Sequence, residues 1–193
     1  MKRVGVAGFE LPLALAEKDL LECFVTDACA ALDPIGRLVR KCSSMSSRHQ
    51  PGFDPSRIIN DPRAFLFFAI ELLGRRLFNS DSFTTHSQTM KDRALSLRSA
   101  NEAIKRDATL FAMSYYAGPA FRKLSSAGKS GLLFQIHPHP RELKRIYEEE
   151  IELTPLARES LMAEKEMQLS PARLDELASE PALARRVMVA SSF

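Results

Sequence analysis

The chain has 193 residues, of which 45% are hydrophobic and 26% are charged, enough for one well-packed domain. Its 27 basic and 24 acidic residues leave a net charge of +3, and the two signs alternate along the chain. Nothing in this charge pattern indicates a nucleic-acid partner. The most apolar stretch, residues 64–74, covers about half of a bilayer and contains Glu71, so we predict no transmembrane helix.

The three cysteines form no CxxC motif, and any disulfide scheme leaves one of them unpaired. Reduced thiols in a cytoplasmic protein are the simplest interpretation. The basic start of the chain is soon interrupted by Glu10, Glu17 and Asp19, which a signal-peptide core does not tolerate.

The first 28 residues contain the pattern of a parallel α/β unit. Residues 3–8 are a short β-branched run closed by Gly8, residues 11–20 are helical in pattern, and residues 20–28 form a second apolar run. Residues 33–61 are rich in Ser and Pro, and we expect a loop or an irregular excursion there.

The clearest helix entry is at residues 61–78, where Asp61 can cap the helix and Pro62 occupies its first turn. Apolar residues surround this helix, which favours a buried core helix over an interfacial one resting on lipid. Residues 79–96 are polar and predicted to be mobile. A helix is expected at 99–107 and a buried strand at 108–118.

The last third of the chain alternates helices with two further strands. A helix should end at Gly128, and Pro155 and Pro171 should separate three helical stretches. The predicted strands are residues 131–137 and 185–193.

Together these elements predict an α/β fold with a mostly parallel sheet of four or more strands and helices on both faces, a single Rossmann-like domain over residues 1–193. Such sheets bind ligands at the carboxyl ends of their strands. The corresponding positions are Gly8 onward, Asp27 onward, residues 115–118 and His137 onward, with Ser191 and Ser192 at a fifth strand end.

Two glycine-containing segments resemble phosphate-binding motifs only in part. In "AGKSG" (127–131), a phosphate-binding loop would need glycine at Lys123, and the segment precedes a predicted strand instead of following one. "VGVAGFELP" has Gly5 and Gly8 but lacks the third glycine of a dinucleotide site. A helix end and a tight turn explain both segments, although Gly8 would still let a ligand approach the backbone.

The segment "QIHPHP" places His137 and His139 at the end of a predicted strand. A zinc site needs a third ligand, and no Cys, Asp or His lies at a familiar spacing, so no metal is expected. Two interpretations stay open. The histidines are polar strand ends in a proline-stiffened loop, or His137 faces a cleft and hydrogen-bonds a sugar or stabilises charge. Tyr115 and Tyr116 are similarly core residues or, at a strand end, residues that stack on a sugar.

Residues 108–193 resemble the amino-terminal domain of retaining, two-domain nucleotide-sugar glycosyltransferases of the group 1, or family 4, type. The resembling segments are "LFAMSYYAG", "GLLFQIHPHP", the acidic helical region that follows, and "ELASEPALARRVMVASSF". The first third of the chain is compatible with the family without being specific to it.

The resemblance implies two facing Rossmann-like domains, of which this chain is the acceptor-side half, with the donor-binding domain missing. The implied activity is transfer of a sugar from a nucleotide diphosphate sugar to a sugar, lipid or other acceptor, without a further cofactor. The fragment alone would be inactive. The implied location is the cytoplasm, where peripheral contact with the inner face of the membrane stays open.

By the same resemblance, His137 matches a cleft histidine near the transferred sugar, and His139 takes this role if the register shifts by two. Gly8 matches a first-loop glycine beside the donor phosphates, and Ser191 and Ser192 match a strand end facing the cleft. The alternative is a stand-alone Rossmann-like module whose acidic helices, between residues 142 and 180, bind a partner protein.

Overall fold

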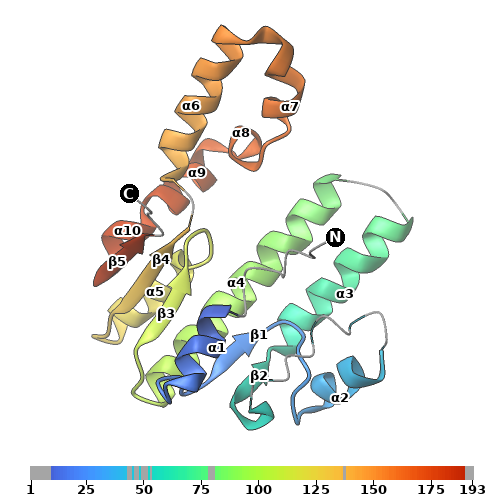
Figure 1. The fold of residues 1–193 in the computed structure, drawn as a ribbon, viewed down its shortest axis with the longest axis vertical. Coiled ribbons are helices and arrows are strands. Elements are labelled where there is room, and N and C mark those ends of the chain that lie inside the picture. The colour runs from blue at the N-terminus through green and yellow to red at the C-terminus, as the bar shows by residue number, and fades with distance from the viewer. Residues whose placement is uncertain are drawn as a thin grey trace. The chain divides into compact units, whose positions relative to one another are not determined.

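The computed structural model describes residues 10–42, 45, 48, 52, 54–77, 81–136 and 138–189. The chain divides into two compact units, Met1–Ser99 and Ala100–Phe193 (Figure 1). The boundary falls within one helix, α4 (Asp81–Lys105).

The first unit contains a two-stranded parallel sheet. Strand β1 (Phe24–Thr26) pairs with β2 (Ile58–Asn60), so that Phe24 is opposite Ile58 and Thr26 is opposite Asn60. The helical elements of this unit are α1 (Glu10–Glu17), α2 (Pro34–Lys41), the 3-10 turn η2 (Pro55–Arg57), α3 (Pro62–Leu77) and the first part of α4.

Helix α3 begins where the sequence predicts. The Asp61 carboxylate accepts a hydrogen bond from the Ala64 amide at 2.8 Å, and Pro62 takes a position that needs no amide donor. Phe65 and Phe68 pack against the small cluster around Val39. The expected burial on all sides is wrong, however, because Leu66 and Leu73 are each 57% exposed.

Two predictions of irregular structure in this unit are also wrong. Residues 33–61 contain α2, η2 and β2, and residues 81–96 belong to the long helix α4. Helix α2 starts at Asp33, whose carboxylate accepts the Gly36 amide at 2.7 Å. In α4 the buried positions include Ser87, Asp92 and Ser96, so the helix has few of the apolar repeats from which helices are predicted.

The second unit contains a three-stranded parallel sheet in the order β3 (Leu110–Met113), β4 (Gly131–Gln135), β5 (Arg186–Val189). Phe111 is opposite Leu132, and Leu132 is opposite Arg186. The helical elements are the end of α4, α5 (Gly118–Ser126), α6 (Pro140–Leu153), η3 (Pro155–Ala157), α7 (Arg158–Met162), α8 (Lys165–Gln168), α9 (Pro171–Ala178) and α10 (Glu180–Leu183).

The core of the second unit lies between its central strand and the helices around it. Leu133 on β4 and both Phe121 and Leu124 on α5 are almost completely buried, together with Ala100 and Ala103 from the end of α4. In Figure 1, α6 leads away from the sheet, and the chain returns through α7 and α8 to α9. Helix α6 is in contact with η3, α7, α8 and α9.

The predicted end of α5 is confirmed. Gly128 has φ +68°, a conformation that glycine adopts without steric cost. The Lys129 amide then donates to the Leu124 carbonyl at 2.9 Å and satisfies a group at the helix end.

The predicted α/β class with parallel strands is therefore confirmed. In the described residues, the expected single sheet takes the form of two small sheets of two and three strands. The predicted first strand, residues 3–8, lies outside the described residues. Among the helices that the structure describes, none combines the length and the apolar character needed to cross a membrane.

Candidate functional site

The strands of the three-stranded sheet run parallel, so their carboxyl ends meet at one edge of the second unit. The segment that follows β3, residues 114–117, connects the sheet to α5 and contains Tyr115 and Tyr116. The segment after β4 leads through His139 into α6. This edge is the candidate site of the second unit.

Tyr115 has an unusual backbone conformation at this edge. Its φ is +76°, a region that a bulky aromatic residue rarely occupies. Such a conformation costs about 1–3 kcal/mol and persists only where surrounding contacts impose it. Only 5% of the Tyr115 surface is exposed, so the strained residue is buried.

Several of the contacts that hold Tyr115 come from the part of the chain that runs from α8 to α10. The Glu180 carboxylate accepts the Tyr115 amide at 2.7 Å. The Tyr115 hydroxyl donates to Glu166 at 2.5 Å, and Arg173 donates to the Tyr115 carbonyl at 3.4 Å. Burial and the neighbouring Glu166 raise the pKa of Tyr115, so the phenol keeps its proton and acts as a donor.

Glu180 is a buried carboxylate surrounded by backbone amides. It is 2% exposed, and besides the Tyr115 amide it accepts the Gly118 amide at 2.9 Å, at the start of α5. Burial raises the pKa of Glu180 above its ordinary value, although the hydrogen bonds from the Gly118, Tyr115 and Ala117 amides act in the opposite direction. Glu180 therefore connects the segment that precedes β5 to the loop that follows β3.

An ionic cluster lies next to this contact. Glu176 binds Arg122 of α5 at 2.5 Å and also pairs with Arg173. Partial burial alone would raise the pKa of Glu176, but the two guanidinium groups lower it below its ordinary value. The cluster ties α9 to α5 and orients Arg173 toward the Tyr115 carbonyl.

Tyr116, the next residue, is 39% exposed. The ammonium group of Lys165 lies 5.1 Å from the ring centre of Tyr115 and 5.8 Å from that of Tyr116. Both distances are within the range of cation–π attraction. The edge thus combines one buried and one partly exposed aromatic ring with a shared cation.

His139 makes a structural contact. Its Nε2 atom lies 3.2 Å from the Ala178 carbonyl, so this nitrogen acts as the donor. The contact joins the entry of α6 to the end of α9. The predicted residues Gly8, His137, Ser191 and Ser192 lie outside the described residues, and their predicted roles remain predictions.

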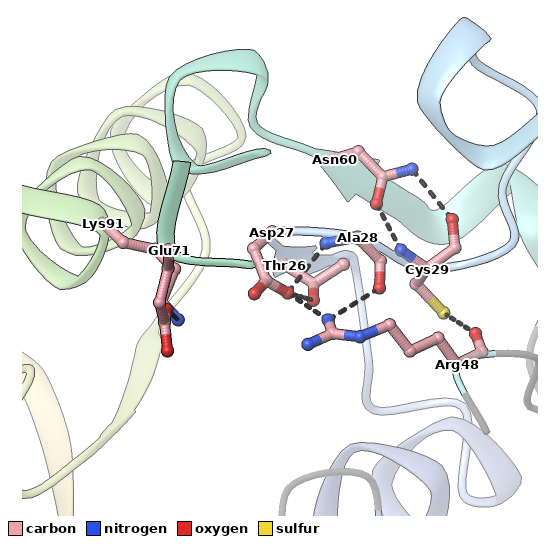
Figure 2. A network of polar contacts seen from close by, with 8 residues as sticks. All are labelled: Thr26, Asp27, Ala28, Cys29, Arg48, Asn60, Glu71 and Lys91. Carbon is pink, nitrogen blue, oxygen red and sulfur yellow. Dashed lines mark hydrogen bonds and ion pairs between the residues drawn. The ribbon is translucent and has the colours of Figure 1, made fainter. Parts of the chain in front are cut away.

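A second polar network lies at the carboxyl end of β1, in the first unit (Figure 2). The Asp27 carboxylate, 8% exposed, accepts the Ala28 amide at 2.7 Å and Arg48 at 2.5 Å. Arg48 also donates to the Ala28 carbonyl at 3.0 Å, and its guanidinium lies 4.4 Å from the ring centre of Phe68. These contacts bind Arg48 to the predicted strand end at Asp27.

The same network includes Cys29 and Asn60 (Figure 2). Cys29 is completely buried, and its thiol donates to the Arg48 carbonyl at 3.0 Å. Burial raises the pKa of this thiol above its ordinary value. A separate buried pair, Lys91 and Glu71, joins α4 to α3 at 2.9 Å. Each polar group drawn here has a protein partner, which favours a structural network over a reactive centre.

Within the described residues, no three His, Cys, Asp or Glu side chains are grouped so that they could hold a metal ion. None of the cysteines Cys23, Cys29 and Cys42 forms a disulfide bond. The described arrangement thus consists of hydrogen-bonded carboxylates, guanidinium groups and aromatic rings.

Comparison with known proteins gives no further assignment: no protein-family model matches the sequence, and neither a curated protein nor a solved structure matches it.

Reasoning from the sequence located the strand end at Tyr115 but did not find the residues that hold it. Glu166, Arg173 and Glu180 are 51 to 65 positions away along the chain, and each lies in a charged helical pattern typical of a solvated surface. One signal existed, because Glu180 lies in the segment "ELASEPALARRVMVASSF", which is part of the family resemblance.

Proposed function

We propose that this chain is the acceptor-side domain of a retaining nucleotide-sugar glycosyltransferase. It would act together with a donor-binding α/β domain and transfer a sugar to a sugar, lipid or other acceptor. The alternative is a stand-alone Rossmann-like module whose acidic helices, between residues 142 and 180, bind a partner protein without any transfer reaction.

The observation that carries the proposal is the hydrogen-bonded loop of residues 114–117, which lies at the carboxyl edge of the β3–β4–β5 sheet. Parallel α/β sheets bind ligands at this edge. Backbone strain such as that at Tyr115 is concentrated at binding and catalytic sites. The segments that surround the edge include those that resemble the glycosyltransferase family, so the strained loop and the resemblance point to the same part of the chain.

In the proposed reaction, the bond between the sugar anomeric carbon and the diphosphate oxygen breaks. The acceptor hydroxyl oxygen forms the new bond to that carbon, its proton passes to the departing diphosphate oxygen, and the nucleoside diphosphate leaves as an anion. Dipoles and basic groups stabilise the departing anion. In this proposal most of those groups belong to the donor-binding domain, while the edge around Tyr116 and His137 contacts the acceptor and the transferred sugar.

The test is an activity assay on the complete protein, together with its donor-binding domain. Release of nucleoside diphosphate is measured with a panel of nucleotide sugars and glycoside acceptors, and the anomeric configuration of the product is determined by NMR. We expect transfer with retained configuration. Hydrolysis only, an inverted product, or no turnover with any donor would contradict the proposal.

The two histidines provide a matched pair of variants. His137→Ala should lower turnover about a hundredfold with little change in melting temperature, because a group beside the transferred sugar acts on the reaction. His139→Ala should instead lower the unfolding free energy by about 1 kcal/mol, because it removes the contact to the Ala178 carbonyl. Unchanged turnover in a folded His137→Ala protein would remove this residue from the mechanism.

A further inference from the structure

Glu180 holds the loop that follows β3, residues 114–117, through hydrogen bonds to backbone amides. One carboxylate oxygen accepts the Tyr115 amide at 2.7 Å and the other accepts the Gly118 amide at 2.9 Å. The two oxygens therefore span the loop from one end to the other. A carboxylate that accepts several backbone amides makes stronger hydrogen bonds than a neutral side chain in its place.

The supported loop cannot keep this conformation by local preference. Tyr115 has φ +76°, and glycine or asparagine would be the usual residue there. The Tyr115 side chain is also anchored, with its hydroxyl at 2.5 Å from Glu166. The loop is thus held at its backbone by Glu180 and at its side chain by Glu166.

The residue that this arrangement presents is Tyr116. It follows the strained position directly, and it is 39% exposed whereas Tyr115 is 5% exposed. The ammonium group of Lys165 lies within 5.8 Å of both ring centres, so one cation attracts the exposed ring and its anchored neighbour. A partly exposed tyrosine offers an apolar ring face and a polar hydroxyl, which suits the ring of a sugar.

We propose that Glu180 is a positioning residue for carbohydrate recognition: it holds the loop of residues 114–117 and the first residue of α5 so that Tyr116 contacts the sugar ring of the acceptor. This inference rests on the proposed function for the class of ligand. The positioning acts through the loop, since Glu180 is itself buried and does not contact the acceptor.

Intrinsic tyrosine fluorescence can be used to measure glycoside binding by this chain. It has three tyrosines and no tryptophan, so the fluorescence of the 193-residue protein comes from Tyr115, Tyr116 and Tyr147. The emission is titrated with methyl glycosides of glucose, galactose, mannose and N-acetylglucosamine. We expect a saturable change with at least one of them in the wild-type protein, and its loss in Tyr116→Ala.

The variant Glu180→Gln keeps the length of the side chain but turns an NH2 group toward one of the two amides. We expect glycoside binding at least about fivefold weaker, because one hydrogen bond to a charged group is lost. Hydrogen–deuterium exchange of residues 110–120 should be faster in this variant. Glu142→Gln is the control, since Glu142 is an exposed carboxylate that pairs with Arg145 within α6; its affinity should stay within about twofold of wild type.

Three results would overturn the inference: no glycoside binding by the wild-type protein, equal affinity in Glu180→Gln despite faster exchange of the loop, or undiminished binding in Tyr116→Ala. The last variant changes a partly exposed side chain and tests the inference even if Glu180→Gln does not fold. Glycoside binding without sugar transfer by the complete protein would contradict the proposed function and leave this inference supported.

Discussion

Asn60 at the end of β2 binds both backbone groups of Cys29, 31 residues earlier in the chain. The Cys29 amide donates to the Asn60 side-chain oxygen at 2.7 Å, and the Asn60 nitrogen donates to the Cys29 carbonyl at 3.0 Å (Figure 2). The side chain of Asn60 thereby continues the pairing of β1 with β2 beyond the last paired residues, Thr26 and Asn60.

Asn60→Ala should destabilise the first unit. It leaves the amide and the carbonyl of the completely buried Cys29 without these partners, at a cost of about 1–3 kcal/mol for each group. Urea unfolding followed by circular dichroism measures the change. The control is Asn101→Ala at an exposed position of α4, which should unfold at the wild-type midpoint. Equal midpoints for the two variants would show that the Asn60 contacts contribute nothing.

Tyr115→Phe should lower the unfolding free energy by about 1.5–3 kcal/mol, because it removes the hydroxyl that donates to the buried Glu166. The ring and its contact with Lys165 are kept in this variant. Tyr147→Phe, at a half-buried position of α6, is the matched control and should change the stability much less. A Tyr115→Phe protein as stable as wild type would argue against the anchor.

Glu180 and Glu176 should give opposite dependences of stability on pH. Burial raises the pKa of Glu180, so its contribution to stability is complete below the ordinary value near 4.5 and is lost as the pH rises through the raised pKa. The pKa of Glu176 is lowered, so its contribution is present above 4.5 and is lost as the pH falls through the lowered pKa.

The measurement is the unfolding free energy between acidic and neutral pH for wild type, Glu180→Gln and Glu176→Gln. The advantage of wild type over Glu180→Gln should decrease as the pH rises above 4.5. Its advantage over Glu176→Gln should decrease as the pH falls below 4.5. Parallel curves for all three proteins would contradict both assignments.

Cys29 should react with iodoacetamide more slowly than the other two cysteines. Its thiol is completely buried, donates to the Arg48 carbonyl and has a pKa raised by burial, so little thiolate is present. Cys23 and Cys42 are half-buried and serve as internal controls in the same protein. Mass spectrometry of peptides after brief labelling measures the three rates, and labelling of Cys29 as fast as Cys23 would contradict the prediction.

The sequence by itself determined those features that depend on neighbours in the chain. Asp61 and Pro62 predicted the start of α3, and Gly128 predicted the end of α5, because helix caps favour particular residue types at fixed positions. The same signal, Asp33 followed by Pro34, stands at the start of α2 and could have been used there. The end of α4 was predicted, but its first part, residues 81–96, was missed because Ser and Asp occupy part of the buried face, where prediction relies on apolar residues.

Only the tertiary structure decided which charged residues are buried. Glu180 and Glu166 lie in helical stretches whose charge suggests a solvated surface, yet they are 2% and 7% exposed. A carboxylate can be buried where donors surround it, and its donors here, the Tyr115 amide and hydroxyl, are 65 and 51 residues away. No local sequence pattern pairs residues that are so far apart in the chain. The strained loop and the carboxylates that hold it could therefore be identified only from the tertiary structure.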